Sequence, residues 1–147
     1  METQSLSLDV EEIVDQTDRR GAMGAFTGGI QGLLGLGTSI SSPRHHPKDY
    51  DLLIIGTPVW MGRVTPAVRT YLDIYGKHIK KAILFCTYKT TGACSALRDM
   101  RKRIKHAKIP AELSFVRPIE RPSEMKEIIE NFFRVCRIGN EPVYNPE

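Results

Sequence analysis

The stretch from Tyr50 to Asp73, YDLLIIGTPVWMGRVTPAVRTYLD, constrains the fold more than any other part of the chain. The apolar run Leu52–Ile55 is typical of a short strand buried in a parallel sheet with both faces covered. A Gly-Thr-Pro sequence then ends the strand. Pro66 favours the start of a helix, with Thr65 as its N-cap. Residues 59–64 are therefore predicted to lie at the carboxyl end of a strand, where open α/β sheets bind ligands.

Strands and helices are predicted to alternate along the rest of the chain. A weakly alternating strand is expected at Leu6–Val14, and buried strands are expected at Ala82–Thr87 and Leu113–Val116. This alternation predicts a parallel sheet with helices on both faces. The polar tail 139–147 is expected on the surface. The predicted helices span 22–36, which is rich in glycine, and 66–75, 93–106 and 123–135.

Size and composition suit one domain that spans residues 1–147. The three cysteines have no metal-ligand spacing and leave one unpaired, which indicates a reducing, cytoplasmic setting. No apolar run approaches the roughly 18 residues of a membrane helix, so we expect no membrane span. The N-terminus lacks the basic and apolar regions of a signal peptide. The formal net charge is only +4, and no motif supports specific nucleic-acid recognition.

Three stretches together resemble flavodoxin-like proteins. They are GTPVWMGRVTPAVRTYL at 56–72, KKAILFCTYKTTGACSALRDM at 80–100 and LDVEEIVDQTDRRGAMGAFTGGIQGLLG at 8–35. The resemblance covers nearly the whole chain and lies in the order and spacing of these stretches. It implies a three-layer α/β fold, in which helices cover both faces of an open parallel sheet.

The resemblance also implies that FMN is the cofactor. In flavodoxin-like proteins, the loop that matches 57–63 places an aromatic side chain against the isoalloxazine ring, and Trp60 would take that place. The loop that matches 87–94 wraps the other edge of the ring through backbone groups. The implied cofactor-binding residues are Thr57, Pro58, Val59, Trp60, Met61, Gly62 and Arg63 in the first loop, and Thr87, Tyr88, Lys89, Thr90, Thr91 and Gly92 in the second.

The sequence departs from this family at its beginning. Flavodoxins start with an apolar strand and a loop of the type S/T-x-T-G-N-T, whose backbone N–H groups cradle the FMN phosphate at a helix N-terminus. The nearest stretches, GAFTGG at 24–29 and GLGTSISS at 35–42, follow no apolar strand. A glycine-rich helix and its stop explain both. We therefore expect the family's first strand and its phosphate loop to be missing. The first strand is central in the family's sheet, so its loss would leave an open strand edge. Such an edge invites association, and we expect a homodimer or a strand from a partner chain.

Positive charge suggests two further roles. Arg63 and Lys89 would favour an anionic reduced flavin and raise its potential, whereas flavodoxins of very low potential place acidic residues around the ring. Two solvated side chains are the alternative. The stretch Arg98–Lys108, RDMRKRIKHAK, carries the densest positive charge. It fits the solvated face of a helix, and a docking surface for an acidic redox partner is the functional alternative.

The remaining reactive side chains give weaker signals. Cys94 begins a helix, where a thiolate is favoured, whereas Cys86 ends an apolar strand, where buried inert cysteine is usual. His45 and His46 lie next to each other in a proline-flanked loop, and a metal site would need further ligands there. Cys136 is expected to fill space in the core or on the surface. We expect no catalytic side chain and no metal ligand.

Two functions from different classes follow. The first is an FMN-binding, flavodoxin-like protein that acts in electron transfer or as a small flavin-dependent reductase, in which the flavin carries out the redox chemistry. The second is a flavodoxin-fold protein that binds no flavin and serves as an interaction or structural subunit. The two ring loops favour the first function, and the departure at the beginning of the chain favours the second.

Overall fold

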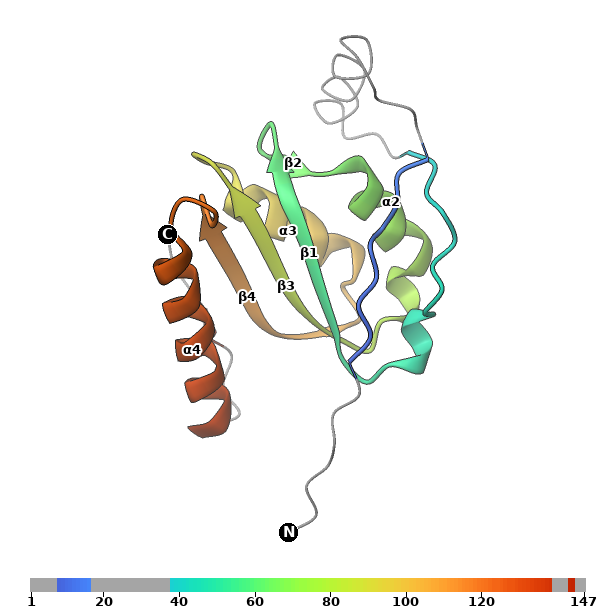
Figure 1. Cartoon of the computed structure of the whole chain (residues 1–147). Coiled ribbons are helices and arrows are strands. Elements are labelled where there is room, and N and C mark those ends of the chain that lie inside the picture. The colour runs from blue at the N-terminus through green and yellow to red at the C-terminus, as the bar shows by residue number, and fades with distance from the viewer. Residues whose placement is uncertain (1–7, 17–37, 139–142, 145–147) are drawn as a thin grey trace.

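A sheet of parallel strands forms the centre of the protein (Figure 1). The computed structural model describes residues 8–16, 38–138 and 143–144, with side chains for 8–16 and 38–132. The described strands follow the order β2-β1-β3-β4-β5, and all pairs are parallel except the antiparallel pair of β1 and β2. Their bounds are Leu53–Trp60 (β1), Arg63–Val64 (β2), Lys81–Tyr88 (β3), Lys108–Val116 (β4) and Val143–Tyr144 (β5).

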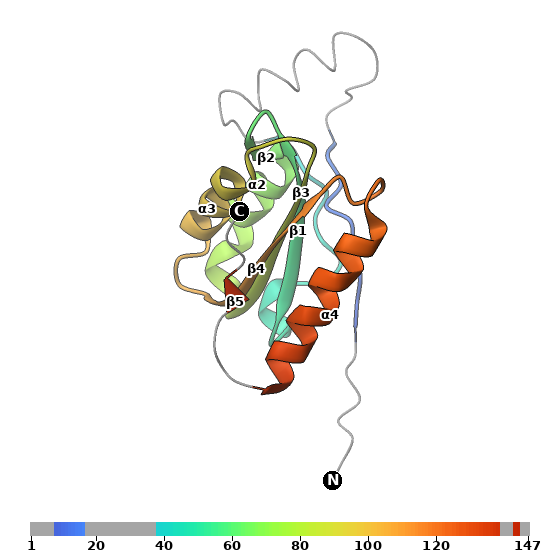
Figure 2. The same cartoon turned by 90° about the vertical axis from the view of Figure 1, so that its left-hand side faces the viewer.

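Helices cover both faces of this sheet, so the predicted α/β architecture is confirmed. Helices α2 (Pro66–Tyr75) and α3 (Ala93–Arg103) lie on one face, and α4 (Pro122–Ile138) lies on the other (Figure 2). Short 3-10 turns, η1 (Pro47–Asp49) and η2 (Gly76–His78), precede β1 and β3. Among the helices of the described ranges, none has the length and hydropathy that a bilayer crossing requires.

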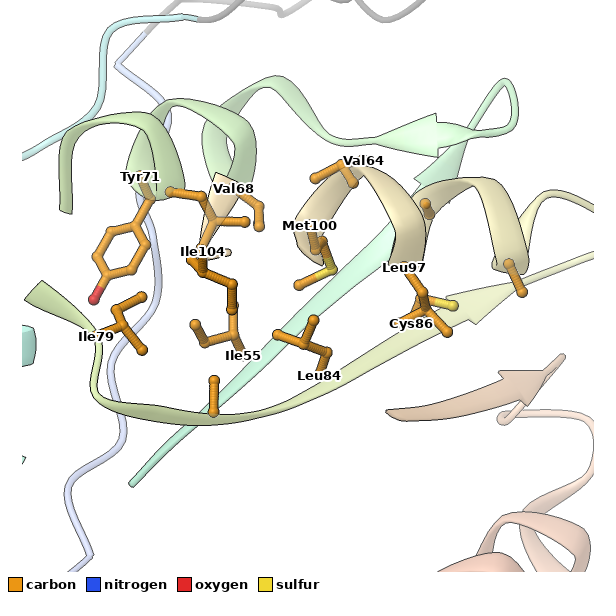
Figure 3. Close-up of a cluster of buried hydrophobic side chains, with 14 residues drawn as sticks. Ile55, Val64, Val68, Tyr71, Ile79, Leu84, Cys86, Leu97, Met100 and Ile104 are labelled. Atoms are coloured by element: carbon orange, nitrogen blue, oxygen red, sulfur yellow. The ribbon is translucent and has the colours of Figure 1, made fainter. Parts of the chain in front are cut away.

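Alternating side chains of the strands fill two cores. On one face, Leu84 and Cys86 of β3 are fully buried with Met100 of α3 and with Ile104, which directly follows α3 (Figure 3). On the other face, α4 buries Phe132 in a second cluster with side chains of β3 and β4. Because β3 is buried from both sides, it reads in the sequence as a continuous apolar run.

Two parts of the chain differ from the expectation. Residues 8–14 form no strand, and an isolated antiparallel bridge joins Asp15 to Ile40. The segment bonds to the loop before β1 instead: the Glu11 carboxylate accepts hydrogen bonds from the backbone N–H groups of Arg44 and His45 at 2.7 and 3.1 Å. The tail also contributes a strand that was not expected, since β5 adds to the end of the sheet beside β4. The predicted helix 22–36 and the stretch 24–29 lie outside the described residues.

β4 begins five residues earlier than predicted and runs through a proline. Lys81 pairs with Lys108 and Ile83 pairs with Ala111, so β4 has one more residue than β3 over this interval. Pro110 lies in that irregular step. A bulge leaves a residue outside the regular ladder, and it therefore tolerates proline within a strand.

Glu112 of β4 gives a prediction about pH. Its Oε1 lies 3.0 Å from Arg101 Nε but has no hydrogen-bond partner, and burial raises its pKa above the ordinary value of 4.5, with Arg101 opposing. Ionising Glu112 thus costs more in the folded state, and its contribution to stability falls as the pH rises through 4.5 to the folded-state pKa. We expect Glu112→Gln to unfold at a higher temperature than the native chain at pH 7, with the difference shrinking at pH 4. A less stable variant at pH 7 would mean that the Arg101 pair outweighs burial.

Candidate functional site

A tight hairpin forms the end of β1. The register pairs Val59 with Val64 and Trp60 with Arg63, which leaves Met61 and Gly62 as a two-residue turn. Both turn residues have positive φ, 49° and 74°, as in a type I′ turn. The sequence predicted a loop here, and the structure instead extends β1 to Trp60 and folds it back. Trp60 and Met61 stay 43% and 63% exposed at the carboxyl edge of the sheet.

Thr57 lies inside the protein rather than at this edge. Its side chain is 2% exposed. Its hydroxyl is 2.9 Å from the Pro58 carbonyl oxygen and 3.2 Å from the Thr65 hydroxyl, and it accepts a hydrogen bond from the Thr65 backbone N–H at 3.3 Å. Thr57 therefore ties β1 to the start of α2 and holds the base of the hairpin.

The second predicted loop meets the hairpin. β3 ends at Tyr88, Lys89–Thr91 are exposed, and Gly92 caps α3 with φ 102°. A Cβ on Gly92 would lie only 2.6 Å from the Gly62 Cα and 3.0 Å from Val59 Cγ1. The two loops that the sequence singled out are thus in backbone contact. Thr87 pairs with Pro58 across the two strands, which brings the strand ends to the same level.

Arg117 supports the second loop, and the sequence analysis did not identify it. Its backbone N–H donates to the Tyr88 carbonyl oxygen at 2.8 Å, and its Nε donates to the Lys89 carbonyl oxygen at 3.0 Å. Its φ of 42° is uncommon for a residue other than glycine. In the sequence, the sole signal was an arginine that follows an apolar strand and precedes a proline. The structure makes Arg117 a positioning residue for the loop 87–92.

This edge of the sheet combines exposed apolar side chains with positive charge. Arg63 and Lys89 are exposed there, and Ile119, in the loop after β4, is 94% exposed. Glu120 lies in the same loop as Ile119 and is 3.4 Å from the Arg117 guanidinium. An exposed indole beside cationic side chains suits a flat aromatic ligand that carries negative charge.

The remaining cysteines and histidines that the sequence analysis considered have different surroundings. Cys86 is buried in the core, and Cys94 is exposed in the first turn of α3. His45 Nδ1 lies 2.8 Å from the Tyr50 hydroxyl, and His46 Nδ1 accepts a hydrogen bond from the Lys48 backbone N–H at 3.2 Å. Within the described residues, no group of three or more histidine, cysteine or acidic side chains is arranged to hold a metal ion.

Comparison with known proteins finds a likeness in structure. No protein-family model matches the sequence, and no curated protein matches it. Among solved structures, the chain is similar to a flavoprotein in complex with FMN from Lactobacillus acidophilus NCFM, with a TM-score of 0.57 and 16% sequence identity. The likeness covers 75% of each chain. The two proteins share the fold, an open sheet with helices on both faces.

Proposed function

We propose that this protein binds FMN and acts in electron transfer or as a small flavin-dependent reductase. The observation that carries the proposal is the contact of the two carboxyl-edge loops at Gly62 and Gly92, directly beside the exposed Trp60. This edge is where open α/β sheets bind their ligands. The FMN complex of the structurally similar flavoprotein supports the choice of cofactor.

The residues at this edge fit the ring of a flavin. Trp60 offers an exposed aromatic face, and the loop 87–92 offers backbone groups held in place by Arg117. Arg63 and Lys89 would favour an anionic reduced ring and a moderate potential. When bound, FMN would supply the electron or hydride transfer, and the protein would position the ring and set the field around it.

Loss of the Trp60 indole is expected to weaken FMN binding about fivefold, because aromatic stacking is worth on the order of 1 kcal/mol. The measurement is a titration of FMN followed by the visible spectrum of the flavin, for the native chain and Trp60→Ala. In the native chain, quenching of the single tryptophan provides a second signal.

Trp60→Phe is the matched control, since it keeps an aromatic face at the same position and should retain most of the affinity. An unchanged affinity in Trp60→Ala would place the flavin elsewhere. Failure of the native chain to bind FMN at millimolar concentration would overturn the proposed function.

An open strand edge favours a second candidate function, that of an interaction subunit. Within the described residues, β1 pairs with β3 on one side and on the other side only with β2, at Val59 and Trp60. No strand in the described ranges pairs with residues 53–58 on that side, and Ile54 is 58% exposed. No charged residue lies between Leu52 and Trp60 to discourage pairing. This edge suits a strand of a second copy of the chain.

The native chain is accordingly expected to be a dimer at micromolar concentration, and Ile54→Lys is expected to be monomeric, because a lysine on this edge opposes pairing. Light scattering coupled to size-exclusion chromatography measures both masses. Ile74→Lys is the matched control, because it changes another exposed isoleucine, on α2, and should leave the dimer intact. A monodisperse native monomer would rule out self-association through β1.

A further inference from the structure

Five lysines lie in or next to η2, β3, the end of α3 and β4, at the amino ends of the central strands. This end of the sheet is opposite the hairpin of β1 and β2 (Figure 1). All five are exposed. They come from η2, from the start of β3, from the turn after α3 and from the start of β4. We call them the lysine edge: Lys77, Lys80, Lys81, Lys105 and Lys108.

The backbone brings these lysines close together. Lys81 and Lys108 occupy paired positions on neighbouring strands, and the Lys108 backbone N–H donates to the Lys80 carbonyl oxygen at 3.0 Å. η2 packs on the end of α3, because a Cβ on Gly76 would lie 2.7 Å from the Arg103 carbonyl oxygen. Lys77 in η2 and Lys105 after α3 therefore belong to segments that lie next to each other at this end of the sheet.

The lysine edge carries an excess of positive charge, since the acidic residues that precede β1 at the same end of the sheet are Asp49 and Asp51. In the part of the chain that the structure describes, none of the five lysines forms an ion pair, whereas the nearby Arg101 and Arg103 are paired with Glu112 and Asp99. Like charges directly across two strands are destabilising. The negative end of a helix dipole favours Lys105, but it does not explain lysines placed on β3 and β4.

We propose that the lysine edge docks an acidic segment of a partner protein. Lysines are flexible point charges, which suit the carboxylates of an acidic chain. Binding to a membrane surface would require exposed apolar side chains. Binding to single-stranded nucleic acid would require exposed aromatic side chains. Between residues 76 and 111 no large hydrophobic side chain is exposed, and the exposed apolar side chains of the neighbouring strand end are the aliphatic Leu52 and Ile54. Because the two edges of the sheet are opposite, the docked partner leaves Trp60 uncovered. This inference goes beyond FMN binding and does not depend on it.

The test uses the full chain and a fluorescein-labelled deca-glutamate peptide, with fluorescence polarisation at low ionic strength. The edge variant is Lys81→Gln with Lys108→Gln. The matched control is Arg98→Gln with Lys126→Gln, which removes the same charge from the outer sides of α3 and α4. We expect the edge variant to lose at least about tenfold in affinity and the control to lose less than about twofold.

Three outcomes would overturn the inference. Equal losses in both variants would mean that only net charge matters. Tighter, edge-dependent binding of a thymidine dodecanucleotide or of phosphatidylserine vesicles would assign the lysine edge to another class of partner. Competition between the peptide and FMN would contradict docking on the opposite edge. The expected losses support the inference by themselves, and an FMN affinity that is unchanged at saturating peptide adds to that support.

Discussion

Asp99→Ala is expected to lower the free energy of unfolding by about 3 kcal/mol, because it removes a carboxylate from a buried arginine. Arg69 of α2 is 1% exposed, and its Nε donates to Asp99 Oδ2 at 3.4 Å while its Nη2 donates to the Val64 carbonyl oxygen at 3.1 Å. Burial lowers the pKa of Arg69, and Asp99 opposes that shift. Without Asp99, the buried Arg69 guanidinium loses a carboxylate that it contacts directly.

Urea unfolding, followed by circular dichroism, measures this loss. The matched control is Asp73→Ala, because Asp73 also pairs with an arginine, Arg103, but is 51% exposed. An exposed ion pair is worth less than about 1 kcal/mol. Arg103 also donates to Asp99 at 3.2 Å within α3. α2 and α3 are therefore linked by the pair of Arg69 with Asp99 and the pair of Asp73 with Arg103. An equal decrease in the free energy of unfolding in Asp99→Ala and Asp73→Ala would show that the burial of Arg69 does not strengthen its ion pair with Asp99.

Local signals predicted the elements that fill the core. The helix 66–75 agrees in both bounds with α2, because a proline at its first position and an apolar stripe both belong to the local sequence. The start of α3 at Ala93 agrees as well, since Gly92 interrupts the chain just before it. β3 was predicted to within a residue at each end, because burial on both faces leaves a continuous apolar run.

Elements that depend on distant partners were predicted less well. The strand expected at Leu6–Val14 has the right alternation, but the described residues 8–14 bond to the loop before β1 instead of joining the sheet. The hairpin at Trp60 was missed because Met61, which is not a usual turn residue, takes a positive φ there. β5 was missed because two residues carry too little pattern to identify a strand.

In the candidate site, too, the general location could be predicted from the sequence, whereas the contacts between distant residues could not. Topology alone indicated that the loops after β1 and β3 would lie at one edge of the sheet. The contact between Gly62 and Gly92 depends on two positive φ values at distant points of the chain, and local patterns do not report such contacts. Thr57 was expected to face the cofactor, whereas its place in β1 buries the hydroxyl. Arg117 donates hydrogen bonds to backbone carbonyl oxygens, which every residue type has. The identity of the residues that it holds therefore gives no sequence signal for this contact.

Gly92→Ala is the variant expected to disturb the candidate site most. A φ of 102° is unfavourable for alanine and costs about 2 kcal/mol. The added methyl group would also lie 2.6 Å from the Gly62 Cα, so the hairpin and the loop must move apart. We therefore expect a lower free energy of unfolding and at least a tenfold weaker affinity for FMN, measured by urea unfolding and by flavin titration.

Gly62→Ala is the matched control that separates the two effects of Gly92→Ala, the strain of a positive φ and the steric clash of the added methyl group. Gly62 also has a positive φ, 74°, but a Cβ there would meet no atom within 4 Å. This variant should lose about 1 kcal/mol of stability and keep most of its affinity for FMN, since the two loops stay in contact. If Gly92→Ala bound FMN as well as Gly62→Ala did, the close approach of the loops would not define the site. A loss confined to Gly92→Ala would tie flavin binding to the contact of two backbone segments.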